Sequence, residues 1–411
     1  MAGRLTRQEK SWVLYDVGNS AFVLLATALI PVYFKALAEP GSSVVVAWGY
    51  AETVASLILA LLMPLLGSLA DLKGNKKKFF AGFVGTGAIA LAALGVPVGA
   101  LAFLVVYVVA SIMLNGSMVF YDAFLVDATT EDRYDEVSAQ GYAWGYIGSC
   151  IPFIACLAVV LAGPSVGIPV DVGMRIAFVV TAAWWVAFSI PLLRTVHQTH
   201  YKERPPHLFK DTFSGLWRTL KRMFGDRRLR LFMLAFFFYI DGVHTIIKMS
   251  TSYGTDLGID ATQLVLALLV TQFVAFPSAI VYGRLSTRFG TKRMLLVAIG
   301  AYFCITLFAA LFLREAVEFW ILALCVGLFQ GGIQALSRSE FGKLIPKEHA
   351  NEYYGFFDIF GKYAAVMGTL LVSVFTQITG NSSLGVLSIA VLFVVGFVLL
   401  WRMPEKTKPS D

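Results

Sequence analysis

Twelve apolar runs, each long enough to cross a lipid bilayer as a helix, divide this chain of 411 residues. A helix needs roughly 20 apolar residues for this, and helices suit the bilayer because they satisfy their backbone polar groups internally. The runs cover residues 12–37, 43–70, 79–99, 101–127, 138–163, 173–194, 229–254, 262–285, 292–313, 317–343, 353–379 and 384–402. Charged residues make up 14% of the chain, against about 25% in soluble domains. The sequence predicts an all-α integral membrane protein with twelve transmembrane helices.

A repeated motif of glycine and charge indicates that the runs form two copies of one unit. The copy that begins at Gly67 reads G-S-L-A-D-L-K-G-N-K-K, and the copy that begins at Gly283 reads G-R-L-S-T-R-F-G-T-K-R. The two copies lie 216 residues apart, and the same offset, without a gap, pairs Glu136 with Glu352. Parallel halves of this kind build transporters whose site lies between the halves.

Lysine and arginine collect in alternate loops, which predicts the orientation of the helices. The basic segments are 4–10, 73–78, 195–230, 288–293, 343–347 and 402–408, whereas the short loops 38–43, 164–172 and 380–383 contain neither residue. Basic loops stay on the cytoplasmic side, and acidic residues such as those of the loop 131–136 contribute little. Both termini are therefore expected in the cytoplasm, and the net charge of +7 follows from this topology.

The segment between the sixth and seventh runs is the one long linker. From about residue 209 to residue 224 it contains a basic amphipathic stretch in which Phe213, Leu216 and Leu220 recur at helical spacing. Such a helix lies in the headgroup layer and favours anionic lipid. We therefore expect an N-terminal six-helix bundle over residues 1–195, a cytoplasmic linker over 196–228 and a C-terminal six-helix bundle over 229–411.

The sequence gives no indication of a metal site, a cofactor or a catalytic centre. The histidines of the linker are irregularly spaced, and the four cysteines lie inside apolar runs. A phosphate loop of the form G-x-x-x-x-G-K-[ST] cannot be found, so direct ATP-driven transport is not expected. The basic residues are spread over separate loops, so we expect no nucleic-acid partner. We expect a monomer that is not an enzyme.

Several segments resemble a known family. A G-x-x-x-D-x-x-G-x-K-K loop between two apolar runs is similar to that of the major facilitator superfamily, and residues 12–22, 239–248, 334–341 and 344–364 resemble its Atg22-like, or UMF1, branch. The resemblance spans essentially the whole chain. It implies two six-helix bundles related by a pseudo-twofold axis, and alternating access without ATP. Fungal members are associated with amino-acid efflux from the vacuole, whereas the compact loops here look bacterial, which implies the inner membrane.

Ionisable side chains inside the apolar runs are the best candidates for a site, because they are costly there and usually face a cavity or a partner. The seventh run carries Asp241, His244 and Lys248, and their spacing of three and four places them on one helix face. This stripe predicts a proton relay or a site for a zwitterion. The alternative is an internal ion pair that fixes the helix to a neighbour.

Other polar residues of the runs are further candidates, and two of the interpretations stay open. Asp358 and Lys362 are four apart and form either a structural pair or a pair that opens with substrate. Asp16 is either a gating residue or an acid stabilised by the helix dipole. Asn19 lies deeper and could hydrogen-bond substrate, and the carboxyl of Glu52 could titrate.

The motif loops suggest a gate on the cytoplasmic side. In the superfamily, the acid that corresponds to Asp71 helps to close this side, partly through a helix N-terminus. The second copy has Thr287 at the equivalent position, so a charge-based latch would be one-sided.

The repeat offset also matches Asp122 with Arg338 and Asp127 with Lys343. Opposite charges at equivalent positions would face each other across the pseudo-twofold axis if both line the cavity. We expect Asp122 and Arg338 to form a gate, and Asp127 and Lys343 to be merely interfacial.

These features together predict a proton-coupled secondary transporter of a small polar or zwitterionic solute, such as an amino acid. One alternative is a proton-antiport exporter of amphipathic compounds or lipid. Another, from a different class, is a membrane receptor or scaffold that has lost transport.

Overall fold

The computed structural model describes residues 4–38, 44–96, 99–203, 208–256 and 258–405, and these residues fold almost entirely as helices. Ten of the described helices are long and apolar enough to cross a membrane. Two of the expected spans fall outside these ten. The helix α4 (Lys76–Ala93) has 18 residues and begins with three lysines, and the helix α1 (Arg7–Ala28) carries Arg7, Glu9, Lys10 and Asp16. The expected count of twelve therefore depends on these two helices.

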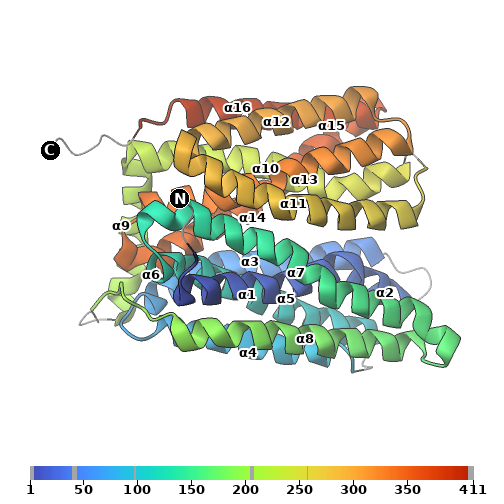
Figure 1. Ribbon diagram of the computed structural model, residues 1–411, viewed down its shortest axis with the longest axis horizontal. Coiled ribbons are helices and arrows are strands. Elements are labelled where there is room, and N and C mark those ends of the chain that lie inside the picture. Colours follow the sequence, from blue (N-terminus) through green and yellow to red (C-terminus); the bar gives the residue numbers. More distant parts are fainter. Residues whose placement is uncertain (1–3, 39–43, 97–98, 204–207, 257, 406–411) are drawn as a thin grey trace. The chain divides into compact units, whose positions relative to one another are not determined.

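The chain forms two compact units, and unit 1 consists of residues 1–212 together with 346–356. Its further helices are α2 (Ile30–Leu37), α3 (Val44–Ala70), α5 (Gly99–Ala123), α6 (Leu125–Ala128), α7 (Tyr134–Ala162) and α8 (Val170–Thr195). The helix α1 packs against α7 and α8, and α5 packs against α3 and α4 (Figure 1). The first turns of α14 (Ala350–Thr379) also belong to this unit.

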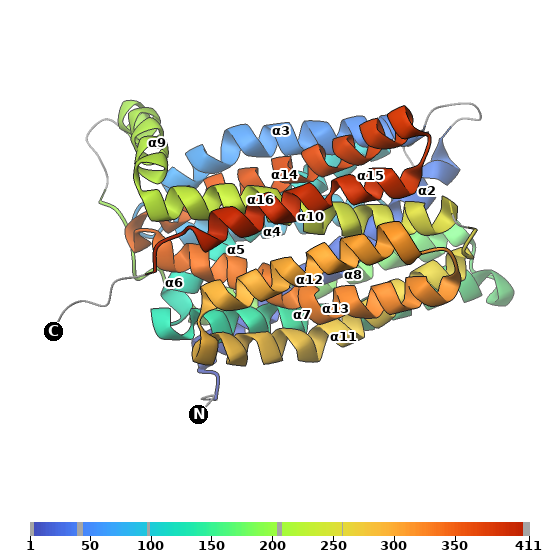
Figure 2. The same cartoon turned by 90° about the horizontal axis from the view of Figure 1, so that it is seen from above.

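Unit 2 consists of residues 213–345 together with 357–411. Its helices are α10 (Arg227–Asp256), α11 (Ala261–Phe289), α12 (Thr291–Phe312), α13 (Ala316–Leu344), the rest of α14, α15 (Ser382–Ser388) and α16 (Ala390–Trp401). The helix α10 packs against α16, and α13 packs against α11 and α12. In Figure 2, α15 and α16 follow one another in nearly one direction, with a break at Ile389.

The 216-residue offset of the motif also relates the helices. The offset carries the first residues of α3, α4, α5 and α7 to within one residue of the first residues of α11, α12, α13 and α14. Equivalent helices also pack in equivalent pairs: α3 with α5 and α4 with α5 in unit 1, α11 with α13 and α12 with α13 in unit 2. The two halves are therefore copies in structure as well as in sequence.

The first apolar run forms two helices rather than one. The helix α1 ends at Ala28, and α2 begins at Ile30 with Pro31 in its first turn. Proline has no backbone N–H, and its ring clashes with the carbonyl of the preceding turn, so a continuous helix cannot pass through this position undisturbed. The amphipathic stretch of the linker is also helical, as α9 (Leu208–Gly225).

Two glycines of α7 let it approach α1 closely. A Cβ atom at Gly148 would lie 2.5 Å from Cγ1 of Val17, and one at Gly145 would lie 2.9 Å from Oγ of Ser20. Small residues permit this kind of backbone approach between membrane helices. The contact fixes α7 against the face of α1 that also carries Asp16.

We predict that Gly148→Val destabilises the protein by about 1–3 kcal/mol, because the larger side chain must displace Val17. Gly85→Val is the matched control, since a Cβ atom at Gly85 in α4 would meet nothing within 4 Å. Thermal unfolding of the purified variants in detergent measures the difference. Equal melting temperatures for the two variants would contradict the close α1–α7 contact.

Candidate functional site

The carboxylate of Asp71 caps the N-terminus of α14. Asp71 is fully buried in the loop after α3. Its Oδ1 accepts hydrogen bonds from the backbone N (2.9 Å) and Nδ2 (2.7 Å) of Asn351, and its Oδ2 accepts one from the backbone N of Glu352 at 3.1 Å. The first N–H groups of a helix lack partners within it and carry partial positive charge. A carboxylate at this point therefore satisfies three donors and the helix dipole together.

Two features of unit 1 bring Asp71 to this position. A Cβ atom at Gly67 would lie 2.5 Å from the carbonyl oxygen of Asn351, so the first glycine of the motif lets α3 approach α14. The second, Gly74, has a φ of 77°, a left-handed conformation that glycine adopts without strain and that turns the chain into α4. The glycines of the motif thus place its acid.

Burial raises the pKa of Asp71, while the amines of Lys202 and Lys76 and the hydrogen bonds from Asn351 act in the opposite direction. The net effect is a pKa above the ordinary value. This carboxylate therefore takes up a proton at a higher pH than an exposed aspartate does.

A buried ion pair lies beside this loop. Nζ of Lys76 is 2.6 Å from Oδ2 of Asp127, and both side chains are fully buried. Oδ1 of Asp127 accepts hydrogen bonds from the backbone N (2.8 Å) and Oγ1 (2.7 Å) of Thr199 and from the backbone N of His200 at 3.0 Å. Asp127 is thus part of the motif-loop structure, and the expectation that it is merely interfacial is wrong. The signal in the sequence was Lys76, which belongs to the repeated motif.

Burial acts to raise the pKa of Asp127, but Lys76, His200 and Thr199 outweigh it and hold the pKa well below its ordinary range. A carboxyl with a depressed pKa contributes stability above the ordinary pKa of aspartate, and this stability is lost as the pH falls through the depressed value. The ion pair therefore contributes fully at neutral pH.

The linker also contacts the loop after α3, residues 71–75, which we call the motif loop. We call residues 196–202 of the linker the strap. The backbone N of Lys202 donates to the carbonyl of Asp71 at 2.8 Å, and the backbone N of Lys73 donates to the carbonyl of Lys202 at 3.3 Å. Nε2 of Gln198 donates to the same carbonyl of Asp71 at 3.2 Å, and its Oε1 accepts from the backbone N of Gly74 at 3.0 Å. The strap is therefore bound to the motif loop along its length.

The polar residues of α1 face the interior of unit 1. Oδ2 of Asp16 accepts a hydrogen bond from the hydroxyl of Tyr121 on α5 at 2.6 Å, and Oδ1 accepts one from Nδ2 of Asn19 at 3.3 Å. Asp16 and Asn19 are both buried. The dipole interpretation of Asp16 is wrong, because α1 begins at Arg7 and the effect of the dipole is confined to the first turn. The structure brings the predicted residues Asp16 and Asn19 together.

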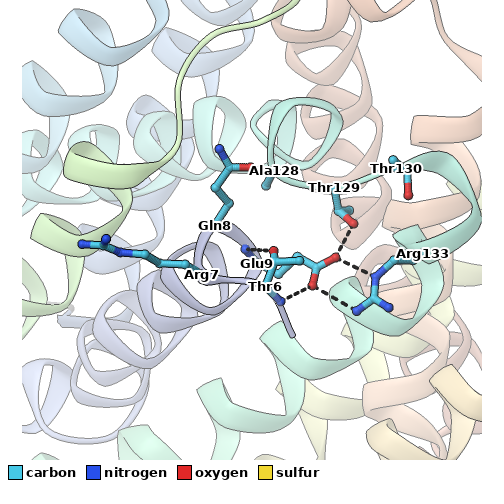
Figure 3. A pocket seen from close by; sticks show the side chains of 8 residues that line it. All are labelled: Thr6, Arg7, Gln8, Glu9, Ala128, Thr129, Thr130 and Arg133. Carbon is cyan, nitrogen blue, oxygen red and sulfur yellow. Dashed lines mark hydrogen bonds and ion pairs between the residues drawn. The ribbon is translucent and has the colours of Figure 1, made fainter. Parts of the chain in front are cut away.

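A pocket of about 420 Å³ lies where α1 begins (Figure 3). The buried carboxylate of Glu9 accepts from Nε (2.7 Å) and Nη2 (3.0 Å) of Arg133, from Oγ1 of Thr129 (2.6 Å) and from the backbone N of Thr6 (2.7 Å). The first turn, where a carboxylate gains from the dipole, thus holds Glu9 rather than Asp16. These bonds fix the start of α1 to the connection between α5 and α7.

In unit 2, Asp241 of α10 contacts the backbone of the neighbouring helix α14. Its side chain is fully buried, and its Oδ1 accepts a hydrogen bond from the backbone N of Gly368 of α14 at 2.9 Å. Oγ1 of Thr245 donates to the same oxygen at 3.3 Å. Oδ2 has no hydrogen-bond partner among the described atoms. A Cβ atom at Gly368 would lie 2.7 Å from Oδ1, so glycine is required here.

The other two residues of the stripe do not pair with Asp241. His244 is half-buried and Lys248 is exposed, and no ion pair between described residues joins either of them to Asp241. The three side chains become more exposed along this helix face, from the carboxyl to the imidazole to the amine.

The remaining predicted residues lie in three places. Lys362 and Asp358 form an ion pair within α14, and each side chain is about a fifth exposed, at 21% and 23%. The hydroxyl of Tyr107 on α5 donates to Oε1 of Glu52 on α3 at 2.5 Å. Asp122 lies half-buried on α5 in unit 1, and Arg338 lies buried on α13 in unit 2.

We predict that Lys76→Met destabilises the protein by about 3–5 kcal/mol at neutral pH, because it leaves Asp127 buried without its cation. Lys78→Met is the matched control, since this exposed neighbour should change stability by about 0.5 kcal/mol or less. Unfolding measured from pH 8 downwards should show a difference that shrinks as the pH falls, because Asp127 without its cation takes up a proton at a higher pH and is then no longer a buried unpaired charge. A Lys76→Met protein as stable as the control at pH 7 would contradict this account.

The chain matches known proteins over most of its length. Residues 126–410 match the family model described as "Vacuole effluxer Atg22 like". The uncharacterised MFS-type transporter YxiO of Bacillus subtilis is 49% identical over 416 residues, which cover 99% of this chain and 97% of that protein. Autophagy-related protein 22 of Cryptococcus neoformans is 26% identical over 251 residues, or 56% of this chain and 44% of that protein.

Solved structures share the fold. The major facilitator superfamily transporter FucP in its outward conformation has a TM-score of 0.75 at 14% identity, with 96% of this chain and 98% of that chain covered. The human organic anion transporter MFSD10 has a TM-score of 0.74 at 16% identity, with 96% and 99% covered. These structures confirm the predicted fold class. The chain is an integral membrane transporter of the major facilitator superfamily and belongs to its Atg22-like family.

Proposed function

We propose that this transporter moves a small polar or zwitterionic solute by alternating access and couples the movement to protons through Asp241. One observation carries the proposal. The carboxyl of Asp241 is fully buried within a membrane-spanning helix, one oxygen is held by the backbone N–H of Gly368, and the other has no partner among the described atoms.

The chemistry of a buried carboxyl supports proton binding at this oxygen. An ionised carboxylate is costly in an apolar environment, whereas the protonated form is neutral. In the arrangement described, Oδ1 is already an acceptor for two donors, so the proton resides on Oδ2. When the site opens to water or to a cationic group, the free-energy cost of the ionised form falls and the carboxyl releases its proton. The Asp241 carboxyl would then bind either a proton or the ammonium group of a substrate, but not both at once.

The rest of the α10 face suits the transfer of this proton and the binding of a zwitterion. His244 lies one turn beyond Asp241 and is half-buried, so a ring nitrogen that can bind and release a proton lies on the same helix face as the carboxyl. The exposed amine of Lys248 one turn further on offers a positive charge for a carboxylate. An amino acid fits this pair of charges.

We propose further that the cluster around Asp71 is the gate on the cytoplasmic side, with both termini on the same side, and that Asp122 and Arg338 belong to the same gate. The basic loops favour this orientation, and a bacterial inner membrane agrees with the Bacillus relative. The protein acts as a monomer, and α9 binds anionic lipid through its basic face. Trp217 on this helix is 60% exposed, with Nζ of Lys221 lying 5.6 Å from its ring centroid.

A second candidate is an exporter of amphipathic compounds. The observation in its favour is a pocket in unit 2 between α10, α11 and α13, whose lining is mostly apolar and includes Ile246, Leu268, Phe319 and Val326. Its volume of about 60 Å³ accepts a few methylene groups rather than a whole solute, so the zwitterion remains the main proposal.

The substrate can be found by a thermal-shift screen of the purified protein against metabolites, because a ligand that binds only the folded state raises the melting temperature. Amino acids and other zwitterions are the expected hits. Amphipathic compounds would favour the exporter. A receptor or scaffold would bind its ligand but would show no flux in proteoliposomes.

With that ligand, we predict that Asp241→Asn abolishes accumulation driven by a pH gradient in proteoliposomes but retains ligand binding, because the amide keeps the contact with Gly368 and cannot release a proton. His244→Gln should be milder and should shift the pH optimum. Asp171→Asn, which changes a half-exposed carboxylate at the start of α8, is the control. Normal gradient-driven accumulation by Asp241→Asn would exclude Asp241 and make Glu52 or Asp122 the next carboxylate to test.

A further inference from the structure

The linker between the two units makes more polar contacts with the motif loop than a connection requires. Lys202 is bonded to this loop through both its N–H and its carbonyl, and Gln198 bridges Asp71 and Gly74. The side chain of Lys202 then reaches Glu352 at the start of α14. We propose that Lys202 is a positioning residue of the gate, and that the strap holds it as the shared cation between the Asp71 and Glu352 carboxylates. The term gate rests on the proposed function.

The backbone of Lys202 is held in register with the motif loop. Lys202 and Leu72 form a short parallel bridge, with bonds of 2.8 Å to the carbonyl of Asp71 and 3.3 Å from the backbone N of Lys73. The amine of Lys73 lies 5.1 Å from the ring centroid of Tyr201, the preceding residue of the strap. A long lysine side chain loses considerable rotamer entropy when it is fixed in one place. Because these bonds already fix the backbone of Lys202, less conformational entropy is lost when its side chain is fixed as well.

The electrostatics explain why a cation is required at this point. Asp71 and Glu352 are both almost fully buried, and the backbone N of Glu352 bonds to the carboxylate of Asp71. Two carboxylates confined to one buried site repel each other unless a cation lies between them. Nζ of Lys202 contacts Oε2 of Glu352 and lies 3.7 Å from Oδ2 of Asp71.

In the described part of the chain, two further basic groups act on these carboxylates, and each is engaged or titratable. Lys76 acts on Asp71 from a distance but is bonded to Asp127. Nδ1 of His349 lies 3.5 Å from Oε2 of Glu352 and carries charge only when protonated. Lys202 thus gives Glu352 a cation that does not depend on the protonation of His349, and it comes from the linker rather than from either helix of the contact.

This arrangement has a consequence for opening. The strap is bound to the loop by backbone bonds, whereas α14 is bound to the strap by the Lys202 side chain. If α14 leaves the loop, Lys202 stays behind and Glu352 loses its cation. Lys202 therefore favours the closed contact between Asp71 and α14.

Hydrogen–deuterium exchange of the full-length protein, followed by mass spectrometry of peptides covering residues 346–356, tests the proposal without any substrate. In Lys202→Met, the amides of Asn351 and Glu352 should exchange about tenfold faster, as expected for the loss of a charged hydrogen-bond partner. The control Lys78→Met removes an exposed lysine of the same unit and should exchange like the wild type. Unchanged exchange in a folded Lys202→Met protein would overturn the proposal.

A second variant separates the shared charge from a general loss of packing. Lys202→Met combined with Glu352→Gln removes one of the two carboxylates along with the cation, so exchange at Asn351 should return towards the wild-type rate. If Lys202→Met alone does not fold, the double variant should recover folded protein. Failure of the double variant to improve on the single one in either measurement would overturn the shared-cation role. Because neither measurement involves transport, failure of the Asp241 experiment would leave this result unaffected.

Discussion

The buried carboxylate of Asp71 at the N-terminus of α14 is the interaction on which the polar contacts of the loop after α3 converge. Three donors from Asn351 and Glu352 hydrogen-bond to it. The motif requires glycine at position 67, because any side chain there would clash with the backbone of Asn351. The ion pair of Lys76 with Asp127 and the strap both attach to the same loop. A single acid thus binds the start of a helix whose later turns belong to unit 2.

Asp241 uses the same chemistry in a different place. It also takes a backbone N–H of α14, at Gly368, and it also requires glycine for the approach. The difference lies in the surroundings. Asp71 has Lys202 and Lys76 nearby and three donors, whereas Oδ2 of Asp241 has no partner among the described atoms. A carboxylate with fixed donors suits a structural contact, and one with a vacant oxygen suits reversible protonation.

The sequence predicted what depends on periodicity and on repetition. Apolar runs of helical length determine the helices, and the motif offset of 216 residues predicts equivalent helices in each half. The sequence also identified Asp71, through the motif, and Asp241, as an ionisable residue inside an apolar run. The missed residues, Lys202 and Gly368, contribute through contacts between segments far apart in the chain, and Lys202 lies in a linker whose composition resembles a solvated loop. The role of Asp127 could not be predicted because its place at the end of an apolar run is that of an interfacial acid, whereas its partner Lys76 lies 51 residues away in the sequence.

The most direct test measures whether Asp71 holds the start of α14. In a variant without the four native cysteines, Ala350→Cys places a thiol at a position that is fully buried at the first residue of α14. We predict slow alkylation by a polar maleimide in this protein, fast alkylation after Asp71→Asn, and no change after Asp132→Asn, which alters an exposed acid. Equal alkylation rates with and without the Asp71 carboxylate, in folded protein, would contradict the account.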